Sequence, residues 1–315
     1  MPYPLTDNDI YQLNNDILPA FTRMKMGDHL GGVGQNPSGG ADFFVDGNKS
    51  DDLGDGLSWA SAKKLLASAI TLANTYESTS ANRAWAKRQR IHCTGDTLAE
   101  DLAILPRKCD IIGYGSHNAN PMCCLEGVHA ITTVSAGTRF INMRLKIKSA
   151  GGDIFTAGNN IVSGLEFRAC VFDAHEATKA GGAIILGTTV NTRILGCRFE
   201  GAFSDAVIEI GTGHSPDMII ADNIIEGANA GIEINSGFTT TQWKSFILRN
   251  TIYTGTECIN DAADKFAIIG NMAVTEQAKG AGGAGAIVGN EFLSAGNKIA
   301  ASDLANADWP ALGTL

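Results

Sequence analysis

Two glutamates occupy equivalent places in a repeated apolar pattern and could form a pair of catalytic carboxylates. Glu209 and Glu233 each stand between two isoleucines, in the stretches VIEI and GIEI. In a strand the isoleucines face inward and the glutamate faces outward. Stacked strands lie about 4.8 Å apart, close to the roughly 5 to 5.5 Å between the carboxyl groups of a retaining glycosidase. This pair is therefore the sequence's candidate for polysaccharide cleavage.

The alternative is that both glutamates belong to a solvated or intersubunit face. The same position one repeat earlier is Ile185, and no aromatic cluster that could stack a sugar flanks the pair. Surface carboxylates are also far commoner than catalytic ones. We therefore expect Glu209 and Glu233 to have a surface role and keep the glycosidase as the alternative.

The acidic loop DGNKSDDLGD at 46–55 is a candidate calcium site. Asp46, Asn48, Ser50 and Asp52 supply oxygen atoms at alternate positions. The loop lacks the glycine at position six and the distal glutamate of an EF-hand loop. Asp, Asn and Gly are also the ordinary turn residues, so we expect a turn here, with a metal site as the alternative.

Other catalytic arrangements are incomplete. The basic residues that a lyase would need lie on the predicted strands of successive repeats, at Arg144, Arg168, Arg193 and Arg198, without a matching set of aspartates. His175 and His214 are isolated loop residues. The stretch GGVGQNPSGG lacks the Lys-Ser/Thr pair of a phosphate-binding loop. We expect no cofactor and no resident metal.

A repeat must position all of these side chains. Seven apolar segments each carry an asparagine or a cysteine, at Asn142, Cys170, Cys197, Asn223, Asn250, Asn271 and Asn290. The steps between them are 28, 27, 26, 27, 21 and 19 residues, which is the period of a solenoid. A second apolar run recurs at Ile184, Ile208 and Ile232, so each repeat holds at least two strands.

Stacking explains why such short strands can be stable. A coil of short strands placed on a similar coil pairs its backbone groups with the coils above and below, and a right-handed crossover is the expected hand. Asparagine tolerates the left-handed conformation of a corner, and its amide can bond to the same residue one coil away. We therefore expect the seven key residues to form one structural ladder, with the cysteines in the same inward slot.

The segments DFFVDGNKSDDLGDGLSWASAKKLLASAITLAN and IHCTGDTLAEDLAILPRKCDIIGYG carry a family resemblance. A first strand, an Asp/Gly-rich loop, a Gly-Leu-Ser-Trp start and an amphipathic helix follow one another, with Ser58 as a plausible N-cap. Over residues 41–295 the chain resembles the right-handed parallel β-helix proteins of the pectate-lyase-like superfamily. The resemblance implies an all-β, single-stranded, right-handed parallel β-helix with a helix that caps its open end.

The chain divides into an arm (1–40), a strand and capping helix (41–90), the β-helix (91–295) and a tail (296–315). The arm carries an apolar set at helical spacing, formed by Ile10, Leu13, Ile17, Leu18 and Phe21. A Gly-rich linker follows it. Because the interior of the solenoid is already filled, we expect the arm to dock on neighbouring subunits or on a particle. Its folding back over the cap is the alternative.

Composition excludes several classes of function. The net charge of -9, without a basic stripe, argues against a nucleic-acid partner. No stretch approaches 18 apolar residues, so we expect no membrane span. Seven cysteines without CxxC spacing indicate reduced, structural thiols.

The start MPYPLTDNDIYQLNND has no basic region followed by an apolar run, so we predict no secretion signal. This favours a virion protein assembled in a host cytoplasm over an exported enzyme. A β-helix with a polar, Gly-rich arm resembles the trimeric spikes, fibres and capsid decoration proteins of tailed bacteriophages.

That resemblance implies a homotrimer bound to other virion proteins, with host surface polysaccharide as a further partner. Trimerisation would explain apolar side chains that we expect to face outward, at Phe155, Ile185 and Phe246. A polysaccharide-active enzyme (lyase or glycosidase) and a glycan-binding surface β-helix remain the alternatives, because fold alone does not fix function.

Overall fold

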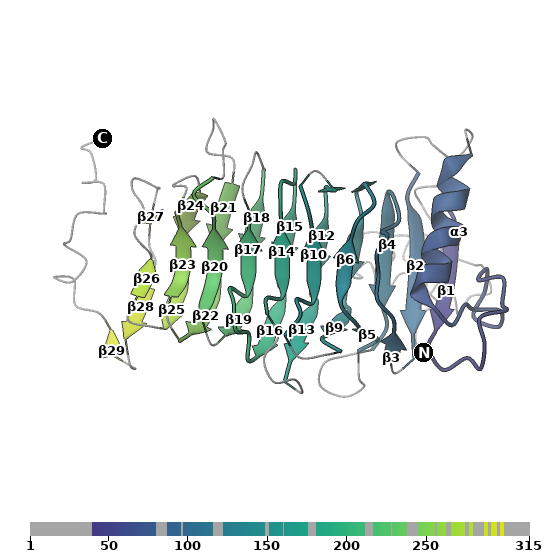
Figure 1. Ribbon diagram of the computed structural model, residues 1–315, viewed down its shortest axis with the longest axis horizontal. Helices are drawn as coiled ribbons and strands as arrows, with labels where there is room; N and C mark the ends of the chain where they lie inside the picture. Colours follow the sequence, from purple (N-terminus) through teal and green to yellow (C-terminus); the bar gives the residue numbers. More distant parts are fainter. Residues whose placement is uncertain are drawn as a thin grey trace, which may run out of the picture.

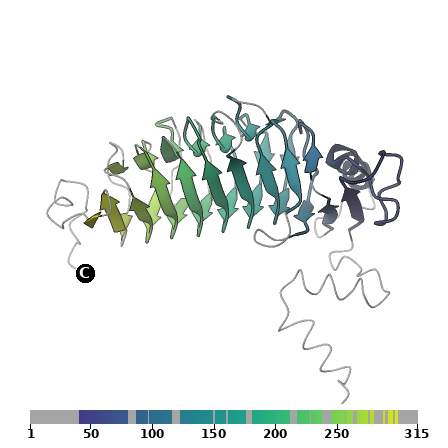
Figure 2. The ribbon, with the colours of Figure 1, turned by 90° about the horizontal axis from the view of Figure 1, so that it is seen from below.

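The chain forms a parallel β-helix, in which short strands stack coil upon coil along one axis (Figure 1). The computed structural model describes residues 40–79, 87–95, 97–115, 122–148, 151–159, 161–175, 181–211, 217–227, 229–237, 245–255, 257–262, 266–274, 277–279, 287–288, 291–294 and 297–298. Seen from below, the stacked strands form one elongated body (Figure 2).

Three parallel sheets make the walls of the solenoid. Sheet 1 consists, in order, of β1 (Asp42–Asp46), β2 (Gln89–Thr94), β4 (Cys109–Gly113), β8 (Arg139–Ile141), β12 (Glu166–Arg168), β15 (Arg193–Leu195), β18 (Ile219–Ala221), β21 (Ser245–Leu248), β24 (Phe266–Ile269) and β27 (Ile287–Val288).

Sheet 2 consists of β3 (Thr97–Ala99), β5 (Cys124–Glu126), β9 (Arg144–Lys146), β13 (Val171–Ala174), β16 (Arg198–Gly201), β19 (Ile224–Gly227), β22 (Thr251–Thr254), β25 (Met272–Val274), β28 (Glu291–Ser294) and β29 (Asn297–Lys298).

Sheet 3 consists of β6 (His129–Ile131), β10 (Phe155–Ala157), β14 (Ile184–Leu186), β17 (Ile208–Ile210), β20 (Ala230–Ile234), β23 (Glu257–Asp261) and β26 (Gln277–Lys279). A short pair, β7 (Ser135–Ala136) and β11 (Val162–Ser163), lies at one corner. Only the last pairing, between β28 and β29, is antiparallel among the described strands. From β4 to β26 the chain thus visits the three sheets in turn, once per coil.

The core is a set of columns in which each inward side chain lies on its counterpart in the next coil. On sheet 1, Phe140 aligns with Phe167 and their rings stack at 5.2 Å; on sheet 2, Phe172 and Phe199 stack at 4.7 Å. Phe155, which we predicted to face outward, is fully buried and meets the Phe167 ring edge-on at 5.1 Å. That prediction was wrong because residues 155 and 157, not 156, are the inward positions of β10.

A single helix of the described residues, α3 (Leu66–Ser78), covers the N-terminal end of the solenoid (Figure 1). Its buried face consists of Leu66, Ala69, Ile70 and Ala73. Ser58 is not its N-cap, because the cap position is Leu65, whose side chain makes no capping hydrogen bond. The carboxylate of Glu100, from the adjoining coil, instead accepts hydrogen bonds from the backbone N–H groups of Leu66 (2.6 Å) and Ala67 (2.8 Å). No helix in the described ranges is long and apolar enough to cross a membrane.

Candidate functional site

The acidic pair lies on the outer face of sheet 3. Glu209 of β17 and Glu233 of β20 are directly paired in register, and Ile185 holds the preceding place in the same column, as the repeat predicts. Both glutamates are half-buried. Asn235 donates a hydrogen bond of 3.0 Å from Nδ2 to Oε1 of Glu209. The pair therefore stands on neighbouring coils, as the retaining-glycosidase hypothesis requires.

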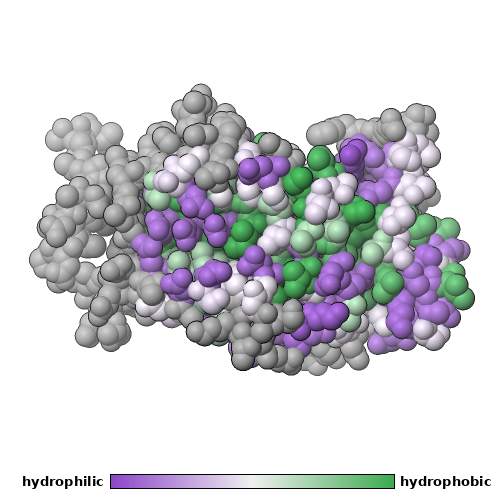
Figure 3. All heavy atoms as spheres, viewed as in Figure 1, coloured by the Kyte–Doolittle hydropathy of each residue, from purple (hydrophilic) through white to green (hydrophobic). Residues whose placement is uncertain are grey.

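The electrostatics of this face follow from partial burial and from its neighbouring carboxylates. Burial, and then the charges of Glu209 and Asp205, raise the pKa of Glu233. Burial and the charge of Glu233 likewise raise the pKa of Glu257. Figure 3 shows this face, with hydrophilic residues gathered toward the C-terminal strands and hydrophobic ones nearer the middle. An environment that raises the pKa of a carboxyl group is what a general acid needs.

The surroundings of the pair do not complete a sugar site. Along the same outward column stand Thr156, Ile185 and Asn260, none of which offers an aromatic ring. Among the described residues, no group of three or more His, Cys, Asp and Glu side chains is arranged to hold a metal ion. The pair can thus exchange protons, but this column supplies no stacking platform.

The acidic loop is used to hold the cap. Asp52 Oδ1 accepts hydrogen bonds from the N–H groups of Lys64 (2.7 Å) and Leu65 (3.0 Å), and Oδ2 accepts one from the Ser68 hydroxyl. Burial alone would raise the pKa of Asp52, but these hydrogen bonds outweigh it and the pKa is lowered.

Asp46 and Asn48 form a turn in the same loop. Asp46 Oδ1 accepts the N–H of Asn48 at 3.0 Å. The structure thus uses two of the predicted ligands, Asp46 and Asp52, to bind the backbone.

Three asparagines form a ladder at the corner between sheets 1 and 2. Asn223 Nδ2 donates to Oδ1 of Asn250 at 2.8 Å, and Asn250 Nδ2 donates to Oδ1 of Asn271 at 2.9 Å. Each of these oxygens also accepts the backbone N–H of the asparagine one coil earlier. All three side chains are buried. The ladder therefore couples three consecutive coils through side chains as well as through strands.

Asn142 does not belong to this column. Cys170 and Cys197 occupy the ladder position in their coils. In the coil of Asn142 that position is Met143, because the residue after it, Arg144, pairs with Val171, the residue after Cys170. The residue before the ladder position takes the left-handed conformation in each of these coils, at Asn142, Ala169, Gly196, Asp222, Arg249 and Gly270. Asn142 is thus one residue early, and its side chain donates instead to the carbonyl oxygens of Gly113 and Gly115. Asn290 lies outside the described residues.

All seven cysteines are free and buried. Burial raises the pKa of Cys123 to about 12 and that of Cys124 to about 11. A thiol that stays protonated is a poor nucleophile and a poor metal ligand. These cysteines therefore act as small apolar side chains.

Sequence reasoning missed an Asp–His pair on sheet 2. His175 lies beside Asp173: its Nδ1 is 2.9 Å from Asp173 Oδ1, and its backbone N–H donates to the same oxygen at 2.9 Å. Arg144, one coil earlier, donates from Nε to Oδ2 at 3.0 Å. The Asp173 side chain is almost fully buried, whereas that of His175 is 57% exposed. The DxH spacing was the signal that could have found this pair.

A second missed cluster lies at the start of sheet 1. His92 bridges Tyr114 (Nδ1 to the hydroxyl, 2.9 Å) and Asp42 (Nε2 to Oδ1, 3.2 Å). The rings of Phe44 and Trp59 pack against it. Trp59 lies between the acidic loop and helix α3, so the cluster also fastens this connecting segment to the sheet. Aligning β1 with β2 places Phe44 on His92 and could have found it.

The predicted basic residues are mostly neutralised within the molecule. Arg168 pairs with Glu166 at 2.6 Å, and Arg198 pairs with Glu200. One outer column of sheet 1 alternates in charge, through Asp42, Arg90, Asp110, Arg139, Glu166 and Arg193. The same column then turns apolar, at Ile219, Phe246 and Ala267. His214 and the predicted docking residues Ile10, Leu13, Ile17, Leu18 and Phe21 lie outside the described residues.

Comparisons of this chain with protein-family models, with curated protein sequences and with solved structures give no match.

Proposed function

We propose that the chain is a structural subunit of a tailed-bacteriophage particle, in a capsid decoration or a tail spike or fibre, that is attached by its N-terminal arm and projects its β-helix. The observation that carries the proposal is that the two ends of the solenoid differ. Strand β1 and helix α3 lie at one end of the stack, and β26 to β29 lie at the other (Figure 1). The arm precedes β1, so attachment through it would leave the opposite end free to project.

The interactions between neighbouring coils support the proposal that the β-helix is a stiff rod. Aromatic rings stack from coil to coil at 5.2 Å and 4.7 Å, and the asparagine ladder adds hydrogen bonds along the axis. Ion pairs tie outer positions of neighbouring coils, such as Arg139 Nε with Asp110 Oδ1 at 2.6 Å. A projecting spacer needs such axial coupling.

The outer face of sheet 1 supports assembly into a homotrimer. In β18, β21 and β24 its outward residues are Ile219, Ala221, Phe246, Leu248, Ala267 and Ile269. Ile219, Phe246 and Leu248 are only partly buried, and Ile269 is 37% exposed. Contiguous apolar positions on a sheet face are typical of an interface.

The alternative is a polysaccharide-active enzyme or a glycan-binding surface protein. The observation that favours the enzyme is the raised pKa of Glu233 beside Glu209 on the next coil. An acid and a nucleophile at that spacing would make a retaining glycosidase.

The test is immunogold electron microscopy of phage particles with an antibody against residues 41–295, together with sedimentation of the purified chain. We expect labelled particles and a trimer in solution. A chain beginning at Ala41 should keep the circular dichroism of the β-helix and lose its attachment. Unlabelled particles, together with glycan cleavage that disappears in Glu209→Gln/Glu233→Gln, would establish the enzyme instead.

A further inference from the structure

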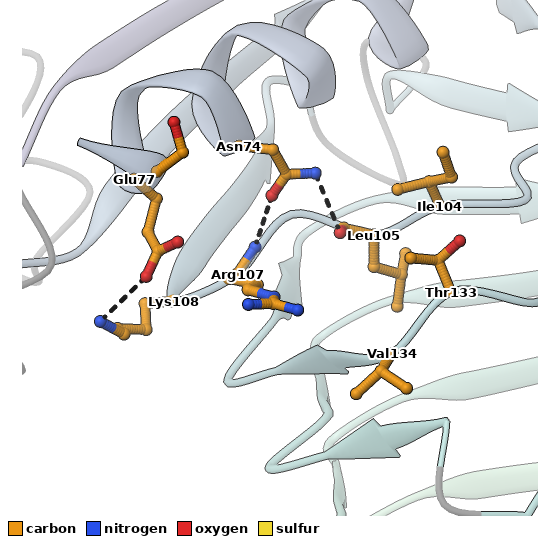
Figure 4. A pocket seen from close by; sticks show the side chains of 9 residues that line it. Asn74, Glu77, Ile104, Leu105, Arg107, Lys108, Thr133 and Val134 are labelled. Carbon is orange, nitrogen blue, oxygen red and sulfur yellow. Dashed lines mark hydrogen bonds and ion pairs between the residues drawn. The ribbon is translucent and has the colours of Figure 1, made fainter. Parts of the chain in front are cut away.

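A groove of about 560 Å³ lies between helix α3 and a corner of the solenoid (Figure 4). Asn74 and Glu77 line it from the helix, and segments 104–108 and 133–134 line it from the coils. Asn74 fixes the two walls to each other: its Oδ1 accepts the N–H of Arg107 at 3.1 Å, and its Nδ2 donates to the carbonyl of Leu105 at 3.4 Å. The groove between the capping helix and the coils is therefore held in shape by hydrogen bonds across it.

The lining is mixed, and it contains exposed apolar side chains and one cation without an ion pair among the described residues. Ile104 and Val134 are exposed to 47% and 55%. Lys108 is paired with Glu77 at 3.2 Å, whereas Arg107 is exposed and forms no ion pair within the described part of the chain. A complementary ligand would bring an apolar face edged by a carboxylate.

The junction between the arm and the cap, at Gly40, lies close to this groove. Gly40 would contact the Arg88 carbonyl if it carried a side chain, so the first described residue lies against the start of β2. The N–H of Gln89, the first residue of β2, donates to the Lys108 carbonyl at 3.0 Å, which places the groove residue Lys108 beside the next strand, β4. The exit of the arm is thus about two strand spacings, or roughly 10 Å, from the groove. The last described strand, β29, lies at the opposite end of the stack.

The arm's sequence has the required chemistry. The helical spacing of Ile10, Leu13 and Ile17 makes an apolar face, and Asp9 and Asp16, seven residues apart, fall on one flank of that face. We propose that the groove is the seat of the chain's own segment 9–21, with its apolar face on Ile104 and Val134 and its acidic flank on Arg107. This inference does not rest on the proposed function, since it concerns the isolated subunit.

Reach and concentration favour the chain's own arm over that of a second copy. Residues 22–39 span up to about 60 Å when extended, well beyond the distance required. A tethered segment has an effective concentration in the millimolar range, which exceeds that of any second copy in dilute solution. Seating would cover the apolar face of the arm until a stronger binding surface displaces it.

Disulfide trapping in the full-length chain tests the seat. In Leu13→Cys/Val134→Cys, mild oxidation should give an intramolecular disulfide, detected by mass spectrometry, at a rate that does not depend on protein concentration. The matched control is Leu13→Cys/Tyr253→Cys, because Tyr253 is 42% exposed on the distant strand β22. The native thiols are all buried and should not compete. We expect the disulfide to form at least about tenfold faster in the Val134→Cys chain than in the Tyr253→Cys control.

A charge exchange tests the role of Arg107. Arg107→Glu in the trapping pair should slow the disulfide about two- to fivefold, the effect of losing an exposed ion pair, and Asp9→Arg/Asp16→Arg in the same chain should restore the rate. Equal trapping in the Val134→Cys and Tyr253→Cys chains, or disulfides only between molecules, would show that the groove does not seat the chain's own arm. If neither charge change altered the rate of disulfide formation in the Val134→Cys chain, Arg107 would not be the residue that binds the acidic flank of the arm.

Discussion

The corner between sheets 1 and 2 is filled differently in the two halves of the solenoid. The N-terminal coils place sulfur side chains there, at Cys123, Met143, Cys170 and Cys197, and the C-terminal coils place amides, at Asn223, Asn250 and Asn271. The adjoining inward positions change as well. The coils of Met143, Cys170 and Cys197 hold the stacked phenylalanines, whereas the amide coils hold isoleucines, at Ile220, Ile225, Ile247 and Ile252.

The difference shows two ways of coupling one coil to the next. Large rings that stack along the axis hold neighbouring coils together by dispersion, so the corner needs only an apolar filler. Isoleucines give less contact per coil, and the amides add directed hydrogen bonds between coils. The first half should therefore be sensitive to loss of volume, and the second half to loss of polar partners.

The largest expected effect is that of Phe167→Ala. Phe167 is fully buried and contacts the rings of Phe140, Phe155 and Phe172. Its removal leaves a cavity in the aromatic half, and we expect a loss of about 3 to 5 kcal/mol in the free energy of unfolding, measured with denaturant. A loss below about 1 kcal/mol would mean that the rings do not couple the coils.

The N-terminal half should also be sensitive to acid, through His129. Burial, only partly offset by the charge of Asp101, lowers the pKa of His129 from 6.5 to about 4. Between these values the unfolded chain binds the proton and the folded chain does not. Stability is therefore full above pH 6.5, falls by about 3 kcal/mol as the pH drops to 4, and then levels off.

The matched variant is His129→Asn, whose side-chain oxygen can still accept the N–H of Leu102 that Nδ1 accepts at 3.2 Å. Denaturant unfolding at several pH values should show a flatter profile for this variant than for the wild type. If the free energy of unfolding fell with pH equally in the variant and the wild type, His129 would not be the source of the acid sensitivity.

Asn250→Leu should break the amide half. Its oxygen accepts two donors of Asn223, and its Nδ2 donates to Asn271 and to the carbonyl of Ile220 at 3.0 Å. Leucine leaves these buried groups without partners, and we expect a loss on the order of 1 to 3 kcal/mol. The control Cys197→Asn should be tolerated, because its amide could extend the ladder to Asn223. Unchanged thermal melting of Asn250→Leu would refute the ladder as a source of stability.

The smallest effect is expected for Glu209→Gln/Glu233→Gln. The folded pKa of Glu233 is raised, so the charged pair costs stability above that pKa and is relieved as the pH falls through it. At pH 7 the free energy of unfolding of the double variant should differ from that of the wild type by no more than about 0.5 kcal/mol in either direction. Assembly should be unchanged, whereas loss of a glycan-cleaving activity would overturn the surface role.

The fold could be predicted because its signal is periodic. Apolar alternation and a constant step place Ile208 on Ile232 and Glu209 on Glu233, and the structure has both pairs in register. The periodicity did not identify the exact residue at the ladder position of each coil, since Asn142 and Met143 both fit the pattern. Backbone conformation decided it, because the left-handed position comes one residue before the ladder position.

The interactions that sequence analysis missed are those between residues with no fixed spacing. Glu100 caps a helix that begins 34 residues earlier, and Asp42 meets His92 across 50 residues. Such contacts depend on which strands lie side by side and on the path of a loop, neither of which a period encodes. The candidate groove was missed for the same reason, since Asn74 and Val134 meet only after the cap is seated.

The hydrogen bonds between coils run along the axis of the stack, and this has a mechanical consequence. The chain enters at β1 and its last sheet 1 strand, β27, lies at the far end, so tension applied to the two ends acts along those bonds and opens one coil at a time. Each coil of about 27 residues would release roughly 90 Å of chain. Under load the solenoid should therefore yield in repeated small steps rather than in a single rupture, with the steps at the aromatic and amide coils requiring different forces.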